Sequence, residues 1–356
     1  IDGWTVLNKK VRISQNGSAH SGNYYATLSE DISQGNQPAD DKQPGDLIWE
    51  FETGEDVISA PALGDNGYIY FGSYDNKVYA LNSTTGEKVW DYDTGMPVTS
   101  TPAIGANSTV YIGALSNRFY AFGGKHGNVK WSFKTEGQVR TSPAISGDGH
   151  LVFGSSDNYI YCLKENGELN WKFKTGGMVR SSGAIIEDAV IVPSWDKNVY
   201  AFDIISGENL WTVENRDNIC WHPAVGASLN VYLAASQNKL IVLGKNGDRK
   251  WSANTTRTMQ TTPVFVDSGN VIFAGNSLFN SKTGERVDEL LTAAEFYTPT
   301  LTADETIYFS LSNYLKAFNL KTKKVIWEFE TNGSIEGSPA IDDQGIVYFG
   351  SRDNKF

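Results

Sequence analysis

Seven tryptophans recur at a nearly constant interval along this chain, and this spacing limits the possible folds more than any other feature. They are Trp49, Trp90, Trp131, Trp171, Trp211, Trp251 and, after one gap, Trp327. The first six are spaced 40 or 41 residues apart. Asp288 fills the gap, because Gly284 precedes it by four residues, as a glycine precedes most of the tryptophans. A fixed period of this length is typical of chains built from repeated supersecondary units.

A second motif, of the type Ser-x-Pro-Ala, recurs in phase with the tryptophans. Its eight copies begin at Ser59, Ser100, Thr141, Ser181, Trp221, Thr261, Tyr297 and Gly337. Each repeat also contains two runs that alternate apolar and polar residues, such as 68–72 and 77–81, joined by a turn containing Asp-Asn. Alternation of period two on both sides of such a turn predicts a β-hairpin. Each repeat is therefore predicted to form four strands.

Eight units of this kind predict an all-β fold, an eight-bladed β-propeller of four-stranded antiparallel blades. The phase of the repeat makes 46–51 an outer strand, which we expect to pair with the last blade and close the propeller. The third strand of that blade is nearly absent, because the sequence stops at Phe356. We expect the natural chain to continue past this point; the alternative is that 22–28 takes the place of the missing strand.

The repeat divides the chain into two regions. Residues 46–356 are the predicted propeller, and 1–45 are an N-terminal extension and linker. The polar composition of 33–44 predicts a flexible connection, and one interpretation of the stretch before it is the tail of a preceding domain. The seven tryptophans are predicted to have a structural role, each docking at the end of an outer strand between neighbouring blades.

Composition excludes several classes of function. A formal net charge of -11 argues against nucleic-acid binding, which needs a basic surface. No apolar run is long enough to predict a transmembrane segment. The two cysteines, Cys162 and Cys220, are too far apart in sequence to indicate a metal site or a disulfide framework. The four histidines, His20, His126, His150 and His222, match no metalloprotease or triad pattern.

Residues 80–90, Ala-Leu-Asn-Ser-Thr-Thr-Gly-Glu-Lys-Val-Trp, carry a family resemblance. They resemble the tryptophan-docking repeat of pyrroloquinoline-quinone (PQQ) proteins, and the likeness extends over about 46–356. The same repeat occurs in PQQ-dependent dehydrogenases and in non-catalytic propellers similar to the lipoprotein of the outer-membrane β-barrel assembly machine. The resemblance implies a location outside the cytoplasm, at the periplasm or cell surface or as a secreted protein.

The residues favour the non-catalytic branch of this family. The dehydrogenases have an adjacent cysteine pair and long insertions that build the quinone pocket, and this sequence has neither. Glu336 is the one conceivable metal ligand on an inner strand, and a lone carboxylate does not make a cation site. The Asp-Asn pairs at Asp75, Asp157 and Asp353 are interpreted as hairpin turns rather than calcium ligands. We therefore expect no catalytic residue, no metal and no cofactor, with a PQQ dehydrogenase as the minor alternative.

The remaining candidates lie on the predicted central face of the propeller. One position of each repeat is nearly always apolar, as in Val139 and Val179, and the next one varies. A side chain that varies between blades is suited to binding, whereas the apolar one packs. The candidate ligand-binding residues are Arg140, Arg180, Trp221, His222, Gln260, Phe296, Tyr297 and Glu336.

These residues predict a scaffold that binds a protein or peptide partner through the central funnel or the blade loops. The two arginines on adjacent blades suit an anionic group. The first alternative is a carbohydrate-binding module at the cell surface, because the aromatic candidates could stack on a glycan. The alternative in which these residues only fill the channel also stays open at the level of sequence.

Overall fold

The computed structural model describes 43–356, except 216–218, 220, 227, 257–258, 260–261, 267–268, 276 and 290–298. The predicted extension up to residue 42, the segment 22–28 and four residues of interest, Cys220, Gln260, Phe296 and Tyr297, lie outside the described residues. The chain divides into two compact units. Unit 1 holds the described residues up to Ile104 with Gly123–Asn128 and Pro299–Phe356, and unit 2 holds Gly105–Phe122 and the described part of Val129–Thr298.

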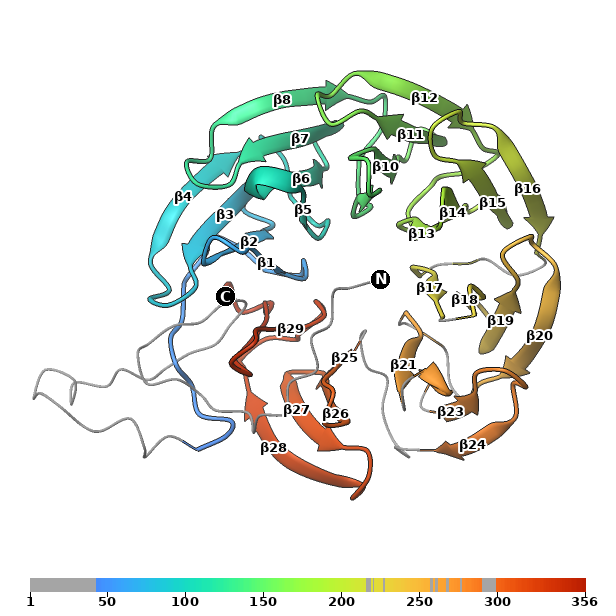
Figure 1. Ribbon diagram of the computed structural model, residues 1–356. Helices are drawn as coiled ribbons and strands as arrows, with labels where there is room; N and C mark the ends of the chain where they lie inside the picture. Colours follow the sequence, from blue (N-terminus) through green and yellow to red (C-terminus); the bar gives the residue numbers. More distant parts are fainter. Residues whose placement is uncertain are drawn as a thin grey trace, which may run out of the picture. The chain divides into compact units, whose positions relative to one another are not determined.

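The strands of unit 1 lie near the two ends of the sequence (Figure 1). They are β1 (Ala62–Leu63), β2 (Tyr68–Gly72), β3 (Lys77–Asn82), β4 (Lys88–Asp93), β5 (Ala103–Ile104), β25 (Thr300–Leu301), β26 (Thr306–Leu311), β27 (Tyr314–Asn319), β28 (Lys324–Glu330), β29 (Ala340–Ile341) and β30 (Val347–Tyr348). Sheets β1-β2-β3-β4 and β25-β26-β27-β28 are antiparallel and follow sequence order.

Unit 2 contains most of the middle of the chain, and its sheets succeed one another in sequence order. Its elements are the short 3-10 helix η2 (Ala106–Ser108), β6 (Thr109–Ala114), β7 (Arg118–Gly123), β8 (Val129–Lys134), β9 (Ala144–Ile145), β10 (Leu151–Gly154), β11 (Tyr159–Leu163), β12 (Leu169–Lys174), β13 (Ala184–Ile186), β14 (Ala189–Pro193), β15 (Asn198–Asp203), β16 (Asn209–Glu214), β17 (Ala224–Val225), β18 (Val231–Ala235), β19 (Lys239–Leu243), β20 (Arg249–Asn254), β21 (Val264–Val266), β22 (Val271–Ala274), β23 (Ser277–Asn280) and β24 (Arg286–Glu289). None of the helices among the described residues is long and apolar enough to cross a membrane.

The prediction of an all-β propeller with four-stranded antiparallel blades is correct, but the predicted count of eight blades is wrong. Among the described residues, seven sheets have four strands, and the eighth repeat forms only the two-stranded sheet β29-β30. The structure thus has seven blades. The sequence stops at Phe356, before the third strand of the eighth repeat can form.

The N-terminal segment pairs with the last repeat, as predicted, at the end of the expected outer strand 46–51. Phe51 N donates to Phe356 O (2.7 Å) and Phe51 O accepts from Phe356 N (2.8 Å), while Thr53 N donates to Asn354 O (2.8 Å) and Glu52 forms an isolated bridge with Lys355. The pairing is limited to these residues, and the correction therefore concerns the number of blades.

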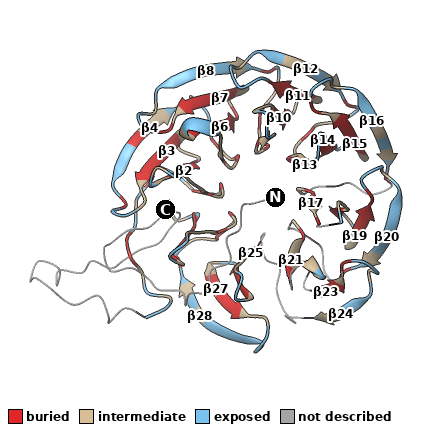
Figure 2. Ribbon diagram, viewed as in Figure 1, coloured by how far each residue is buried: buried red, intermediate tan, exposed pale blue. Residues whose placement is uncertain are grey.

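Burial is highest in the middle strands of the blades and lowest in the outer strands (Figure 2). Middle strands such as β15 are buried at four of six positions, whereas the outer strand β16 is exposed at four of six. Neighbouring sheets of unit 2 pack face to face; one cluster joins Val199 of β15 to Leu233 of β18. Because such hydrophobic clusters lie between neighbouring sheets of unit 2, each of these blades depends on its neighbour for stability.

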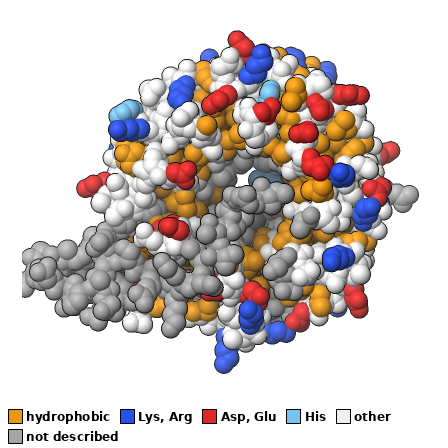
Figure 3. Space-filling model, viewed as in Figure 1, with side chains coloured by type: hydrophobic (Ala, Val, Ile, Leu, Met, Phe, Trp, Pro, Cys, Tyr) orange, Lys and Arg blue, Asp and Glu red, His pale blue; other side chains and the backbone are white. Residues whose placement is uncertain are grey.

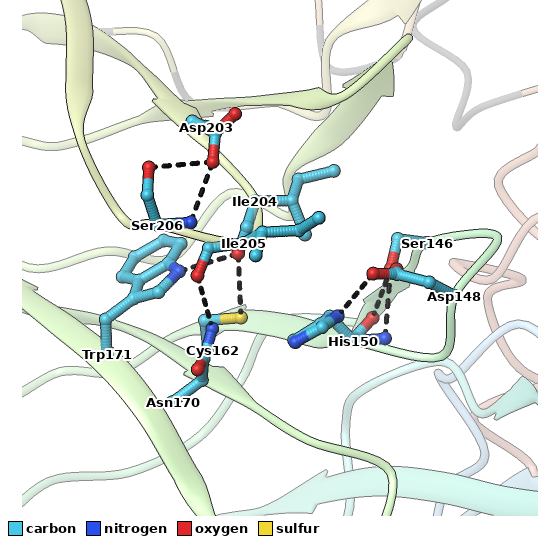
Figure 4. Close-up of polar contacts among 10 residues, drawn as sticks. All are labelled: Ser146, Asp148, His150, Cys162, Asn170, Trp171, Asp203, Ile204, Ile205 and Ser206. Atoms are coloured by element: carbon cyan, nitrogen blue, oxygen red, sulfur yellow. Dashed lines mark hydrogen bonds and ion pairs between the residues drawn. The ribbon is translucent and has the colours of Figure 1, made fainter.

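The tryptophan of one repeat docks on the glycine of the next repeat. Trp171 Nε1 donates to the carbonyl oxygen of Ile204 at 2.7 Å, three residues before Gly207 (Figure 4). A Cβ on Gly207 would lie 2.5 Å from Trp171 Cγ, and this glycine has a φ of +73°. Glycine is therefore required here for two reasons: the Trp171 ring leaves no room for a Cβ, and the backbone is left-handed.

In most repeats the residue that faces the tryptophan across the sheet is small. Ala201 pairs with Trp211 and Cys162 pairs with Trp171, and a β-bulge follows at each of these positions. In the degenerate repeat the partner of Asp288 is the larger Leu278. The next repeat has Lys323 where the others have glycine. Where Asp288 replaces the tryptophan, the small residue across the sheet and the glycine of the next repeat are therefore both replaced by larger residues.

The Ser-x-Pro-Ala motif has a structural explanation of its own. The Ser59 hydroxyl donates to the Gly72 carbonyl oxygen (2.8 Å) and accepts from the Gly72 N–H (2.9 Å), which ties the inner strand to the end of β2. In the fourth repeat Pro193 replaces this glycine and has no N–H to donate. The Ser181 hydroxyl donates instead to Ile219 O at 3.3 Å.

Candidate functional site

Arg180, at the varied position of the fourth repeat, lies on a loop that is held tightly by the preceding blade. Val179, which precedes Arg180, has no exposed surface, and its N–H donates to Ser155 O at 3.1 Å. Gly154 leaves room for this valine, since a Cβ there would lie 2.2 Å from Val179 Cγ1. The loop is therefore fixed by packing and by a backbone bond, and it presents Arg180 from a rigid support.

Arg140 and Arg180 of unit 2 are near enough to interact electrostatically. Both are partly buried. Arg140 donates through Nε and Nη2 to Gln138 Oε1, at 3.0 and 2.9 Å. Burial lowers the pKa of the Arg180 guanidinium, and the positive charge of Arg140 lowers it further. Two cations are thus placed close together on adjacent blades.

A second varied position faces the first one, and sequence reasoning missed it. Trp195 N donates to Met178 O at 2.9 Å, and the Trp195 ring lies under Arg180, with Cζ 4.6 Å from the ring centroid. Ser156 N makes the equivalent bond to Gln138 O, also at 2.9 Å. These residues stand in the x position of the hairpin turn Ser-x-Asp. Its variation between Tyr74, Ser156, Trp195 and Arg352 was the signal that could have identified it.

Trp221 and His222 occupy the fifth repeat. Trp221 is partly buried and packs against the hydrophobic cluster that contains Leu240 and Met259. His222 Nε2 lies 3.2 Å from Ser182 Oγ, which itself accepts a hydrogen bond from Ser142 N at 2.8 Å. These three polar residues occupy the same motif position in consecutive repeats. They form a hydrogen-bonded series that the sequence did not predict.

Desolvation lowers the pKa of His222 to about 4. Part of the residue remains exposed, but the protein atoms around the ring weaken its hydration and disfavour the imidazolium. The imidazole is therefore neutral at pH 7. The contact between His222 Nε2 and the Ser182 hydroxyl forms with either group as donor, according to which imidazole nitrogen carries the proton.

Glu336 of unit 1 has an arginine as its partner. Arg352 donates through Nε to Oε1 (2.6 Å) and through Nη2 to Oε2 (3.2 Å) of Glu336, and through Nη1 to Asp56 Oδ2 (3.1 Å). Both oxygens of the Glu336 carboxylate are thus used in a bidentate ion pair. The other predicted candidates, Gln260, Phe296 and Tyr297, lie outside the described residues.

The recurrent Asp-Asn residues form hairpin turns. Asp75 Oδ1 accepts from Lys77 N (3.0 Å), and its Oδ2 accepts from Gly54 N (2.9 Å) and from the hydroxyl of Tyr79 (2.5 Å). Asn76 has a φ of +74°, a conformation that asparagine tolerates. Both carboxylate oxygens are taken by donors of the protein, so this motif acts as a fold element.

Ser146, Asp148 and His150 also lie together, in the turn between β9 and β10 (Figure 4). The Ser146 hydroxyl donates to Asp148 Oδ1, and His150 Nδ1 lies 2.9 Å from Asp148 Oδ2. A serine nucleophile needs a hydrogen bond to the histidine base, and here both residues bond the aspartate. The turn borders a pocket of ≈ 270 Å³ whose lining includes Tyr111 and Glu165.

Groups suited to metal or covalent chemistry are not assembled within the described part of the chain. No cluster of three or more His, Cys, Asp or Glu residues could hold a metal ion there. Burial raises the pKa of the Cys162 thiol to about 12, and this side chain fills the small position opposite Trp171. Basic and acidic side chains are interspersed over the face shown in Figure 3. The Arg140–Arg180–Trp195 group stands out because it combines two cations and one exposed aromatic ring.

Structural comparison relates this architecture to known propellers. BamB from Moraxella catarrhalis superposes with a TM-score of 0.70 at 19% sequence identity, covering 86% of this chain and 95% of that one. The computationally designed Ika8 protein superposes with a TM-score of 0.74 at 17% identity, covering 86% and 96%. At such identities these matches show the fold alone. No curated protein matches the sequence.

The family comparison is more specific. The model described as outer membrane protein assembly factor BamB matches two overlapping segments, 33–148 and 134–329. Together they span most of the repeats from which the blades are built. The resemblance predicted from the tryptophan-docking repeat is thereby confirmed: the chain belongs to the PQQ-like repeat family of the outer membrane protein assembly factor BamB.

Proposed function

We propose that this protein is a non-catalytic scaffold that acts outside the cytoplasm and binds a protein or peptide partner through the loops that carry the varied positions. The observation that carries the proposal is the pairing of the two varied positions, as in Arg180 with Trp195, on loops fixed by buried valines. A rigid support with side chains that differ from blade to blade favours selective binding, because little entropy is lost on association. Membership in the family of an assembly factor supports the same role.

Site-specific photocrosslinking tests this proposal. The photoreactive residue p-benzoylphenylalanine replaces Trp195 or Ser156 in cells of the source organism, and Leu210 serves as control because it is 50% exposed on the outer strand β16. We expect protein adducts from the two loop positions and not from Leu210. Equal labelling at all three positions, or adducts that contain only glycan, would contradict a protein-binding face.

The location and the absence of catalysis are tested separately. Fractionation of the native cells should place the protein outside the cytoplasm, and recovery in the cytosol would refute this part of the proposal. Adding PQQ with Ca²⁺ should give no stoichiometric quinone absorbance on the protein after gel filtration. Uptake of one quinone per chain would favour the dehydrogenase alternative instead.

The glycan-binding alternative has one exposed aromatic ring in its favour. Trp195 is 40% exposed, but the Arg180 guanidinium already covers one face of the ring. A sugar would have to stack on the opposite face or displace the cation. A peptide carboxylate, by contrast, could bind the arginine while the indole stays in place.

A further inference from the structure

Arg180 has unused hydrogen-bonding capacity. Its Nε is buried and has no hydrogen-bond partner, and the side chain forms no ion pair with any residue that the structure describes. A buried donor that stays unsatisfied destabilises the protein, and more so when the donor is charged. The indole of Trp195 satisfies the face of the guanidinium plane by a cation–π contact but leaves its N–H edge without an acceptor.

In the last repeat, the residues at the two corresponding positions form an ion pair with each other. Arg352 occupies the turn position that Trp195 occupies in the fourth repeat, and Glu336 occupies the position of Arg180. There the arginine and the carboxylate form a bidentate ion pair within the chain. In the fourth repeat the turn position holds an aromatic ring instead of an acid. Among the described residues, a guanidinium therefore stands at this point without the carboxylate that pairs with an arginine in the last repeat.

Arg140 strengthens the case for an anion. It is held by the neutral amide of Gln138, and its charge acts on Arg180 repulsively. A single carboxylate near both side chains would turn this repulsion into two attractive interactions. The planar fork of a guanidinium matches a carboxylate through two parallel N–H···O bonds, and stacking on an indole uses only the face of that fork.

We infer that Arg180, supported by Trp195 and Arg140, forms a subsite for a carboxylate on an acidic peptide segment of the protein partner. The inference rests on the proposed function, because the carboxylate must be carried by a partner. The carboxylate is either an Asp or Glu side chain within the segment or its C-terminus, and the chemistry of recognition is the same. Arg140 provides the second charge, and the Trp195 ring holds the guanidinium in position.

Synthetic peptides test this subsite directly. The probes are an acetylated and amidated peptide of alternating Glu and Gly, the same peptide with Gln for Glu, and the Gln peptide with a free C-terminal carboxylate. Isothermal titration calorimetry gives the affinity, and the Trp195 indole signal in a ¹H–¹⁵N spectrum, assigned with a Trp195→Phe variant, reports the site. We expect the Glu peptide to bind about tenfold more tightly than the neutral Gln peptide and to shift the Trp195 signal.

Variants separate the subsite from a general effect of charge. Arg180→Gln should remove the preference for Glu over Gln, Arg140→Gln should reduce it, and Arg180→Lys should retain only part of it. Arg118→Gln is the matched control, since Arg118 lies in the same unit and donates to Ser132. It should bind the Glu peptide as the wild type does. Thermal unfolding of each variant verifies that the loss of binding is not a loss of fold.

The outcomes distinguish this inference from the proposed function. If the Gln peptide with a free C-terminal carboxylate binds as tightly as the Glu peptide, the subsite recognises chain ends. If it binds more weakly, the subsite recognises acidic side chains. Equal affinity for the Glu and Gln peptides, or full binding by Arg180→Gln, overturns the inference. If crosslinking at Ser156 still captures a protein partner in that case, the scaffold function stands without a carboxylate subsite.

Discussion

Lowering the pH from 7 to 5 should destabilise this protein through a single imidazole, that of His222. The native pKa of about 4 lies well below the value near 6.5 of an unfolded histidine. Between these values the unfolded chain binds a proton that the native state excludes, so the free energy of unfolding falls as the pH falls. The loss at pH 5 relative to pH 7 is about 2 kcal/mol, and it approaches about 3 kcal/mol near pH 4.

Urea unfolding followed by tryptophan fluorescence at pH 7 and pH 5 measures this loss. His222→Gln is the informative variant, because its amide oxygen can still accept a hydrogen bond from the Ser182 hydroxyl but cannot be protonated. Other groups titrate in both proteins, so the quantity of interest is the difference between their pH dependences. His126→Gln, which removes an exposed imidazole, serves as control and should behave as the wild type. The same pH dependence in wild type and His222→Gln would refute the reasoning, as would an NMR titration of His222 with a midpoint near 6.5.

Three further predictions concern the fold. Gly207→Ala should lower the free energy of unfolding by about 2–4 kcal/mol, because the backbone there is left-handed and the new Cβ would clash with the docked ring. Gly147→Ala is the control in the same urea titration. It should change the free energy of unfolding by less than about 1 kcal/mol, because the space where its Cβ would lie is open. Trp171→Phe removes the indole donor and part of the buried ring, so a decrease of about 2 kcal/mol is expected, and an unchanged midpoint would show that the indole bond contributes nothing. The third prediction concerns the Cys162 thiol, tested in a Cys220→Ser variant. Because burial raises the pKa of this thiol to about 12, it should not react with a thiol reagent at pH 8 until urea unfolds the chain. Rapid labelling of the native protein would contradict the burial of this side chain.

The candidate site could be predicted only in part. Periodicity separates an apolar position from a varied one, because a buried residue recurs and an exposed one does not, and Arg140 and Arg180 were found in this way. Trp195 was missed because it is 15 residues from Arg180 in the sequence and lies in a segment that reads as a simple turn. Contact between these two residues depends on how the inner loop and the hairpin turn approach each other in three dimensions. Glu336 was considered as an isolated carboxylate for the same reason, since its partner Arg352 is also distant in sequence.

The repeat pattern by itself determined the class of fold and the four strands of each repeat. These follow from local rules, because alternation and turn residues act over a few residues or one repeat. Only the tertiary structure decided the number of blades. The sequence contains eight motif copies, but the last repeat has only β29 and β30, and its pairing with the N-terminal segment is a single bridge at Glu52 instead of a strand. A motif copy counts as a blade only when all its strands find hydrogen-bonding partners, and such pairing is a property of the folded chain.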